Sequence, residues 1–362
     1  MSRWKLQFRN GTRKDNIELL HDLDIARNSG KRRLKKVFLE TSTRCKADCK
    51  HCYYRYNKNL KEMTLNEVFD IQDFLWNIGV RAITYAGADA IFRTDHKEIL
   101  RRGKDKGFLQ NYCTRGFLSE LEELSEIIDI GPQHIQFSTD PSLCDTKIED
   151  EINRIMVINE LFRKSDVYVS WVITLTKDTL NYIFPIIKAV EESGGDEIRL
   201  HKIVSYGMPF EYRKLIPDSQ QYLDIVTKIV IYFADNYSKG AIIVEDVFSN
   251  YKMVKERLPY IKIPLKFVGC PMGQTALTID NTGAVFICPM CKSPSMKIGE
   301  SWKNLEKIWE KFNESAPYTL DKFVGTKCER CTDFQYCLGG CRCQAVSHSG
   351  LLWGEDPTCL LS

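Results

Sequence analysis

The first two thirds of the chain alternate between short apolar runs and longer amphipathic segments. The short runs predict strands and the longer segments predict helices, because apolar residues recur with the spacing typical of each. This alternation favours a parallel sheet with helices packed outside it. The predicted strands are residues 37–41, 81–85, 108–113, 134–138, 167–174 and 197–204, and the predicted helices between them are residues 65–78, 95–106, 118–128, 148–164 and 182–192.

The start of the first helix carries its own signal. Thr64 is followed three residues later by Glu67, the pattern of a capping box, and Gly79 is placed to end the helix. Further along, residues 220–237 predict another helix and residues 241–248 another strand. Residues 249–269, with Pro259 and Pro264, are interpreted as a linker.

The composition changes sharply at Cys270, since nine of the fourteen cysteines follow from there. We therefore expect four regions: an N-terminal extension (1–36), a barrel (37–240), a bridging segment (241–269) and a cysteine-rich domain (270–362).

Composition limits the function. The chain has 362 residues, 43% of them hydrophobic and 27% charged, and a net charge of +3, which is typical of a soluble globular protein with no nucleic acid or membrane partner. No apolar run is long enough to span a membrane, and the N-terminus lacks a signal-peptide pattern. We expect a cytoplasmic, reducing environment, where many cysteines indicate metal binding rather than disulfides.

Cys45, Cys49 and Cys52 lie directly after the first predicted strand, in a C-x3-C-x2-C pattern. Three thiolates leave one iron of a four-iron cubane without a protein ligand, which indicates chemistry at that iron. The alternative is a zinc site completed by His51.

The C-x3-C-x2-C pattern resembles the signature of the radical S-adenosylmethionine (radical SAM) enzymes. The resemblance implies an open, TIM-like partial (β/α)6 barrel in which S-adenosylmethionine binds the fourth iron of a [4Fe–4S] cluster. Its reductive cleavage would give methionine and a 5′-deoxyadenosyl radical that abstracts hydrogen from the substrate.

Other positions match this family less closely. Residues 86–90 resemble its Gly-Gly-Glu-Pro segment, so that Gly87, Ala88 and Asp89 would lie at the amino group of S-adenosylmethionine, although Asp is shorter than Glu. Residues 114–116 resemble its turn after the third strand. By resemblance Ser138 would contact the ribose and His51 the adenine. The catalytic acid or base is not indicated, and the candidates for substrate contact are Trp171, Arg199, His201 and Tyr206.

The C-terminal cysteines resemble the seven-cysteine signature of the SPASM domain, which holds two auxiliary [4Fe–4S] clusters, three clusters in all. The outer cluster would be bound by Cys328, Cys331, Cys337 and Cys359, and the inner cluster by Cys270, Cys288 and Cys341. Pro264 stands where some members have an eighth cysteine, so the inner cluster either keeps an open iron or is completed by Cys291 or Cys343. A pair of zinc ribbons is the alternative. Cys113 and Cys144 are expected to be ordinary apolar residues.

The resemblance implies oxidation of a substrate, and we expect a ribosomal peptide that is cross-linked, converted to a thioether or excised. The alternatives are oxidation of a small alcohol or sugar, sulfatase maturation and a non-enzymatic iron–sulfur electron carrier. Sulfatase-maturing members have Asp after the cysteine that matches Cys288, and here Pro289 stands there. Expected partners are the substrate, a flavodoxin or ferredoxin as electron donor, and a separate leader-peptide-binding protein.

Overall fold

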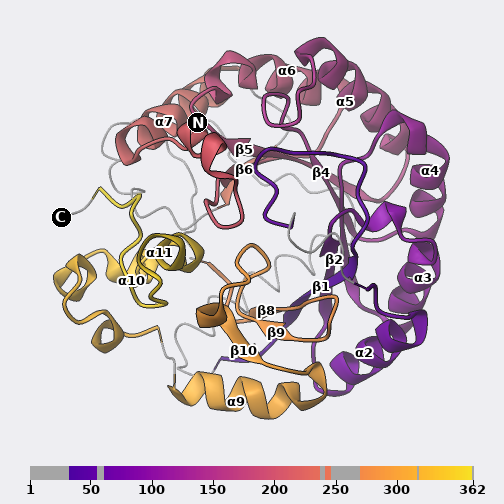
Figure 1. Cartoon of the computed structure of the whole chain (residues 1–362). Coiled ribbons are helices and arrows are strands. Elements are labelled where there is room, and N and C mark those ends of the chain that lie inside the picture. Colours follow the sequence, from indigo (N-terminus) through magenta and orange to yellow (C-terminus); the bar gives the residue numbers. More distant parts are fainter. Residues whose placement is uncertain (1–31, 55–60, 237–240, 246–269, 316–317, 361–362) are drawn as a thin grey trace.

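The ten strands of the described residues form one sheet at the centre of the protein (Figure 1). The computed structural model describes residues 32–54, 61–236, 241–245, 270–315 and 318–360. The strand order is β10-β9-β8-β1-β2-β3-β4-β5-β6-β7. The strands are β1 (Lys36–Ser42), β2 (Ala82–Gly87), β3 (Leu109–Thr114), β4 (His134–Ser138), β5 (Tyr168–Leu175), β6 (Glu197–Lys202), β7 (Ala241–Glu245), β8 (Ala276–Ile279), β9 (Val285–Phe286) and β10 (Lys297–Gly299).

The strands β1 to β7 run parallel in chain order, and the helices that connect them line the outside of the curved sheet (Figure 1). The sheet is curved but open, with β10 and β7 at its two ends. All six predicted strand–helix repeats are confirmed. The helices are α2 (Leu65–Asn77), α3 (His96–Lys106), α4 (Leu121–Ile130), α5 (Ile148–Phe162), α6 (Ile183–Ser193) and α7 (Ser219–Asn236).

The two faces of the sheet differ in polarity. Val37 and Leu39 of β1 are fully buried and belong to the same apolar core as Val68 and Ile71 of α2. The alternate residues of the strands, which point to the concave face, are largely polar and bond to one another, for example Asn111 Nδ2 to Gln136 Oε1 at 3.1 Å. The concave face therefore offers hydrogen-bonding groups that a packed apolar barrel interior would lack.

The predicted capping box of α2 is confirmed. The Glu67 amide donates to Thr64 Oγ1 at 3.2 Å, and the Thr64 amide donates to Glu67 Oε2 at 2.7 Å. The two bonds satisfy amide groups that the first turn of a helix leaves without a partner.

The C-terminal region joins the same sheet. β8 pairs in parallel with β1, and β9 and β10 continue as antiparallel strands. Three helices follow, α9 (Leu305–Ser315), α10 (Phe334–Cys337) and α11 (Arg342–Ser349). The sequence predicted none of these elements.

Strands from both sides of residue 270, the predicted start of the cysteine-rich domain, belong to the same sheet. The division into four regions remains a prediction. The predicted strand at 241–248 is β7, a seventh parallel strand. Residues 1–31 of the predicted extension and 246–269 of the predicted bridging segment lie outside the described residues. No helix in the described part of the chain is long and apolar enough to cross a bilayer.

Candidate active site

The three cysteines of the first motif lie in the loop that follows β1. All three are partly exposed, and the Cys52 amide donates to the Cys49 carbonyl at 3.1 Å, which closes a tight turn between them. Burial and, after it, the charge of Asp89 raise the pKa of the Cys45 thiol to about 12, and Cys49 and Cys52 add to the effect. The three sulfurs are therefore close enough to act on one another.

The Gly87-Ala88-Asp89 segment after β2 is fastened to the start of this loop. The Ala88 amide donates to the Ser42 carbonyl at 3.0 Å, and the Asp89 amide donates to the Arg44 carbonyl at 2.9 Å. Gly87 has φ of +120°, and a Cβ there would lie 2.5 Å from the Ser42 oxygen. A glycine is thus required at 87 for the ends of β1 and β2 to approach each other.

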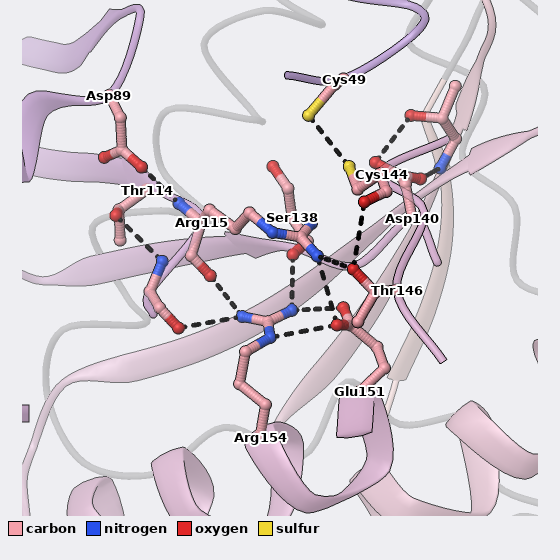
Figure 2. Close-up of polar contacts among 12 residues, drawn as sticks. Cys49, Asp89, Thr114, Arg115, Ser138, Asp140, Cys144, Thr146, Glu151 and Arg154 are labelled. Carbon is pink, nitrogen blue, oxygen red and sulfur yellow. Dashed lines mark hydrogen bonds and ion pairs between the residues drawn. The ribbon is translucent and has the colours of Figure 1, made fainter. Parts of the chain in front are cut away.

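Asp89 joins two of the motifs that the sequence singled out. Its carboxylate accepts from the Arg115 amide at 3.0 Å and from the Ile91 amide at 3.4 Å, so it ties the segment after β2 to the turn after β3 (Figure 2). Burial raises the pKa of Asp89 to about 6 in spite of these bonds. The carboxylate is thus held by the protein itself, so its link to the amino group of S-adenosylmethionine remains a prediction.

Arg154 of α5 braces the turns after β3 and β4 (Figure 2). Its guanidinium donates to the Ser138 carbonyl at 2.8 Å, to the Gly116 carbonyl at 3.2 Å and to the Arg115 carbonyl. The charge is balanced by Glu151, which is fully buried and also pairs with the Arg115 side chain at 3.3 Å. The sequence did not single out Arg154, because an arginine on a predicted helix is usually exposed.

His51 and Ser138 lie at the same end of the sheet. His51 Nε2 is 3.6 Å from Asp140 Oδ2, while its buried Nδ1 has no hydrogen-bond partner among the described residues. Burial lowers the pKa of His51 against the pull of Asp140, so the ring is neutral at pH 7. Ser138 is exposed at the end of β4. The adenine and ribose contacts expected of them stay predictions.

Cys144 corrects one expectation. It was interpreted as an ordinary apolar residue, but its Sγ lies 2.9 Å from Cys49 Sγ (Figure 2). This contact, together with burial, raises the pKa of the Cys49 thiol. Cys113, the other barrel cysteine, donates to Gln136 Oε1 at 3.2 Å.

The C-terminal cysteines fall into two further groups. Burial raises the pKa of Cys337 to about 12, and the nearby thiols of Cys359, Cys328 and Cys331 contribute. These four are the residues predicted for the outer cluster. Burial likewise raises the pKa of Cys288, and the thiols of Cys270, Cys341 and Cys291 contribute. Cys270, Cys288 and Cys341 are the residues predicted for the inner cluster, and Cys291 is one of the two candidates for its fourth ligand.

Cys291 and Cys343 form a buried thiol pair beside the inner group. Cys291 is fully buried, and a hydrogen bond from Cys343 lowers the pKa of its thiol. Cys343 Sγ also lies 3.5 Å from the Met290 carbonyl. Burial raises the pKa of the Cys343 thiol, and Cys288 and Cys341 contribute, so Cys343 lies beside the inner group as Cys291 does. The role of either thiol as a ligand stays a prediction.

The donor chemistry of the three groups fits iron–sulfur clusters. Across the described ranges, no three or more His, Cys, Asp or Glu side chains converge as a single ion would require. A cubane spaces its protein donors more widely, because each thiolate binds a different iron. The first group offers three thiols, the outer group four, and the inner group three with two more beside it.

Two other features of the barrel bear on its chemistry. Trp171 is fully buried, its ring centroid lies 5.1 Å from that of Phe137 in a stacked arrangement, and its Nε1 donates to Asn159 Oδ1 at 2.9 Å. The expectation that Trp171 contacts the substrate was therefore wrong. Glu40 of β1 is fully buried and pairs with Lys292 at 2.7 Å, although the sequence singled out neither. No local signal could have found this pair, because it joins β1 to a loop after β9.

Arg199, His201 and Tyr206, the other candidates for substrate contact, lie on or after β6. Arg199 pairs with Glu197. Burial, and after it the charge of Arg199, lower the pKa of His201 to about 3. Tyr206 is half-buried against the core. Their contact with a substrate stays a prediction.

Comparison with known proteins identifies a domain within this chain. The sequence model of the radical SAM superfamily matches residues 39–214. The PqqA peptide cyclase of Bradyrhizobium diazoefficiens is 24% identical over 336 residues, covering 90% of this chain and 86% of that protein. The PqqA peptide cyclase of Rhodopseudomonas palustris is also 24% identical, over 342 residues, with the same coverage.

Solved structures share the fold. Streptococcus suis SuiB bound to its precursor peptide SuiA superposes with a TM-score of 0.72 at 14% identity, covering 100% of this chain and 84% of that one. Native anSMEcpe with bound AdoMet and Kp18Cys peptide gives a TM-score of 0.66 at 14% identity, covering 90% of this chain and 93% of that one. Residues 39–214 of the chain therefore carry a radical SAM domain.

Proposed function

We propose that this enzyme oxidatively modifies a ribosomally made peptide, by a cross-link, a thioether or an excision. The observation that carries the proposal is the division of its cysteines into a group of three at the end of β1 and two groups in the C-terminal region. Similarity to PqqA peptide cyclases over 90% of the chain supports a peptide as the substrate. SuiB, which has the same fold, was solved with its precursor peptide.

In this proposal Cys45, Cys49 and Cys52 hold the first [4Fe–4S] cluster. When bound, the cluster and S-adenosylmethionine supply a 5′-deoxyadenosyl radical that abstracts a hydrogen atom. Gly87 and Asp89 shape the loop beside the cysteines, and Arg154 holds the turns after β3 and β4 on the other side. These residues orient the bound groups and limit the access of water, which is the part of the work that falls to the protein.

Two auxiliary clusters would complete a set of three. We propose Cys328, Cys331, Cys337 and Cys359 as ligands of the outer cluster, and Cys270, Cys288 and Cys341 as ligands of the inner one, with Cys291 or Cys343 as its fourth. An oxidised substrate must lose an electron as well as a hydrogen atom. An auxiliary cluster held near the barrel by these cysteines could accept that electron, so the proposed clusters favour oxidation of the substrate over isomerisation.

Glu40 is suited to accept the proton that such an oxidation releases. Burial raises its pKa to about 7, and Lys292 opposes that rise. Burial also raises the pKa of Tyr53, with contributions from the nearby charges of Glu40, Cys52 and Cys288, so Glu40 lies in the neighbourhood of both the first and the inner cysteine groups. A carboxylate that titrates near neutral pH can take up and release a proton there.

Sulfatase maturation is the less favoured function, because Pro289 cannot act as a base. Oxidation of a small alcohol or sugar would need the same residues and differs only in the substrate. We expect a flavodoxin or ferredoxin as electron donor, a separate protein to hold a leader peptide, and action in the cytoplasm.

The test is anaerobic reconstitution of the full chain with iron and sulfide, followed by S-adenosylmethionine and a strong reductant. We expect about twelve irons per chain if three cubanes form, and release of 5′-deoxyadenosine without a substrate. A Cys45→Ala variant should lose about four irons and all 5′-deoxyadenosine, while Cys113→Ala should lose neither. Bound zinc in place of iron, or iron without 5′-deoxyadenosine, would overturn the proposal. Incubation with short peptides encoded beside this chain then tests the substrate class by mass spectrometry.

A further inference from the structure

Two loops hold Cys49 and Cys144 against each other, although the residues are 95 positions apart. Lys50, the residue after Cys49, connects the two loops. The Lys50 amide donates to the Leu143 carbonyl at 2.8 Å, and the Lys50 ammonium pairs with Asp145, so the contacts reach both neighbours of Cys144. The Lys50 ammonium also donates to the Ser142 carbonyl at 3.3 Å.

The loop after β4 is itself held in place. The amides of Leu143 and Cys144 both donate to the Asp140 carbonyl, at 3.2 and 3.0 Å, and the Thr146 amide donates to the Pro141 carbonyl at 3.0 Å. Asp140 in turn accepts from the Thr174 amide of β5 at 2.6 Å. The position of the Cys144 sulfur is therefore set by a turn anchored to the sheet.

A buried cation lies beside the two sulfurs. The Arg115 side chain is 8% exposed, and its charge acts on both Cys144 and Cys49. Its Nη2 bonds to Thr146 Oγ1 and to Glu151, whereas its Nη1 has no hydrogen-bond partner within the described part of the chain. The thiol pair therefore lies close to a buried positive charge that Thr146 and Glu151 hold in place (Figure 2).

The separation of the sulfurs decides what the pair can do. At 2.9 Å they are roughly 0.9 Å further apart than in a disulfide bond of about 2.05 Å. Ligands to different irons of a cubane point away from one another, so Cys144 cannot bind beside Cys49 at this spacing. A sulfur in a disulfide carries no thiolate to donate to iron, and the disulfide and the cluster exclude each other.

We propose that Cys49 and Cys144 form a reversible disulfide when the first cluster is absent, and that this bond blocks assembly of that cluster until it is reduced. Two thiols lose two electrons and two protons to form one S–S bond, and molecular oxygen accepts them to give hydrogen peroxide. A cellular dithiol returns the electrons by thiol–disulfide exchange. The effect on assembly rests on the proposed role of Cys49 as a ligand, whereas the bond itself does not.

The first experiment maps the bond in cluster-free full-length protein exposed to air. Remaining thiols are alkylated, the chain is digested without reductant, and the masses of the peptides are measured by mass spectrometry. We expect one cross-linked pair containing Cys49 and Cys144, two hydrogens lighter than the separate peptides, which a dithiol abolishes. Cys144→Ser should lose the pair and Cys113→Ser should keep it. A bond from Cys49 to Cys45 or Cys52, or no bond at all, would overturn the proposal.

The second experiment measures iron uptake after the same oxidation. The oxidised wild-type chain should bind about four irons fewer than the reduced chain, the content of one cubane, and a dithiol should restore them. Oxidised Cys144→Ser should show a clearly smaller deficit than the wild-type chain. An equal deficit in both would refute the block, and failure of the reduced wild-type chain to bind iron would instead refute the proposed function.

Discussion

Lys202, the last residue of β6, forms a buried ion pair with Asp356, which lies 3.3 Å away in the C-terminal region. Asp356 Oδ2 also accepts from the Cys341 amide at 2.8 Å, and its Oδ1 accepts from the Thr358 amide at 2.9 Å. Burial works to raise the pKa of Asp356, but Lys202 and these bonds hold it below its usual value. One carboxylate thus links the barrel to the segments that carry Cys341 and Cys359.

Replacing Asp356 with Asn should destabilise the chain by about 3–5 kcal/mol, because it removes the negative charge that pairs with the buried Lys202 ammonium. The free energy of unfolding from urea titration measures this loss. We also expect iron to be lost from the C-terminal cysteines.

The matched control is Glu192→Gln, which breaks the exposed pair of Lys188 and Glu192, 3.7 Å apart, and should cost less than about 1 kcal/mol. The double variant Lys202→Met with Asp356→Asn should recover part of the lost stability, since the buried ammonium is then removed together with the charge that it pairs with. A double variant less stable than Asp356→Asn would contradict this account.

Gly87→Ala should be more damaging than alanine at another glycine with positive φ. The new Cβ would lie 2.5 Å from the Ser42 carbonyl oxygen, so β1 and β2 must separate where the cysteine loop begins. We expect a loss of roughly 3 kcal/mol or more in stability, with weaker binding of S-adenosylmethionine by the reconstituted enzyme.

Gly194 provides the control for Gly87, because it has φ of +84° and open space around its missing Cβ. Gly194→Ala should cost about 1–2 kcal/mol, the penalty of the left-handed conformation alone. Equal losses of stability in the two variants, measured by thermal unfolding, would show that the contact with Ser42 is unimportant.

The repeats and the cysteine motifs could be predicted from the sequence because both are local. A strand such as β1 or a helix such as α5 is encoded by the spacing of its own apolar residues. Cys45, Cys49 and Cys52 lie within eight consecutive residues. The contacts of Cys144 and Glu40 depend on loops far away in the sequence, to which no periodicity points. β8 and β9 were missed because strands of a few residues carry too little pattern to detect.

Arg154→Lys should loosen the turns after β3 and β4 while keeping the positive charge. Arg154 makes five hydrogen bonds, to the carbonyls of Ser138, Gly116 and Arg115 and twice to Glu151, whereas a lysine has three N–H donors, so some of these buried oxygens lose their partner. We expect a loss of about 2–4 kcal/mol in the free energy of unfolding. Arg163→Lys, which alters an exposed pair with Glu160 at the end of the same helix, should change it by less than about 0.5 kcal/mol. Similar values for the two variants would contradict the bracing role of Arg154.

Glu40 should make the stability of the protein depend on pH between about 4.5 and 7. Burial raises its pKa from 4.5 to about 7, against the effect of Lys292 and with a smaller contribution from Asp280. The folded chain therefore binds more protons than the unfolded chain in this window, and the free energy of unfolding falls as the pH rises through it, by up to about 3 kcal/mol. Urea titrations from pH 4.5 to 8 should show this fall in the wild-type chain and a smaller one in Glu40→Gln. Glu122→Gln, at an exposed position of α4, should keep the wild-type slope. Parallel curves for the wild-type chain and Glu40→Gln would show that this carboxyl does not titrate near neutral pH, and would remove the reason for proposing it as a proton acceptor.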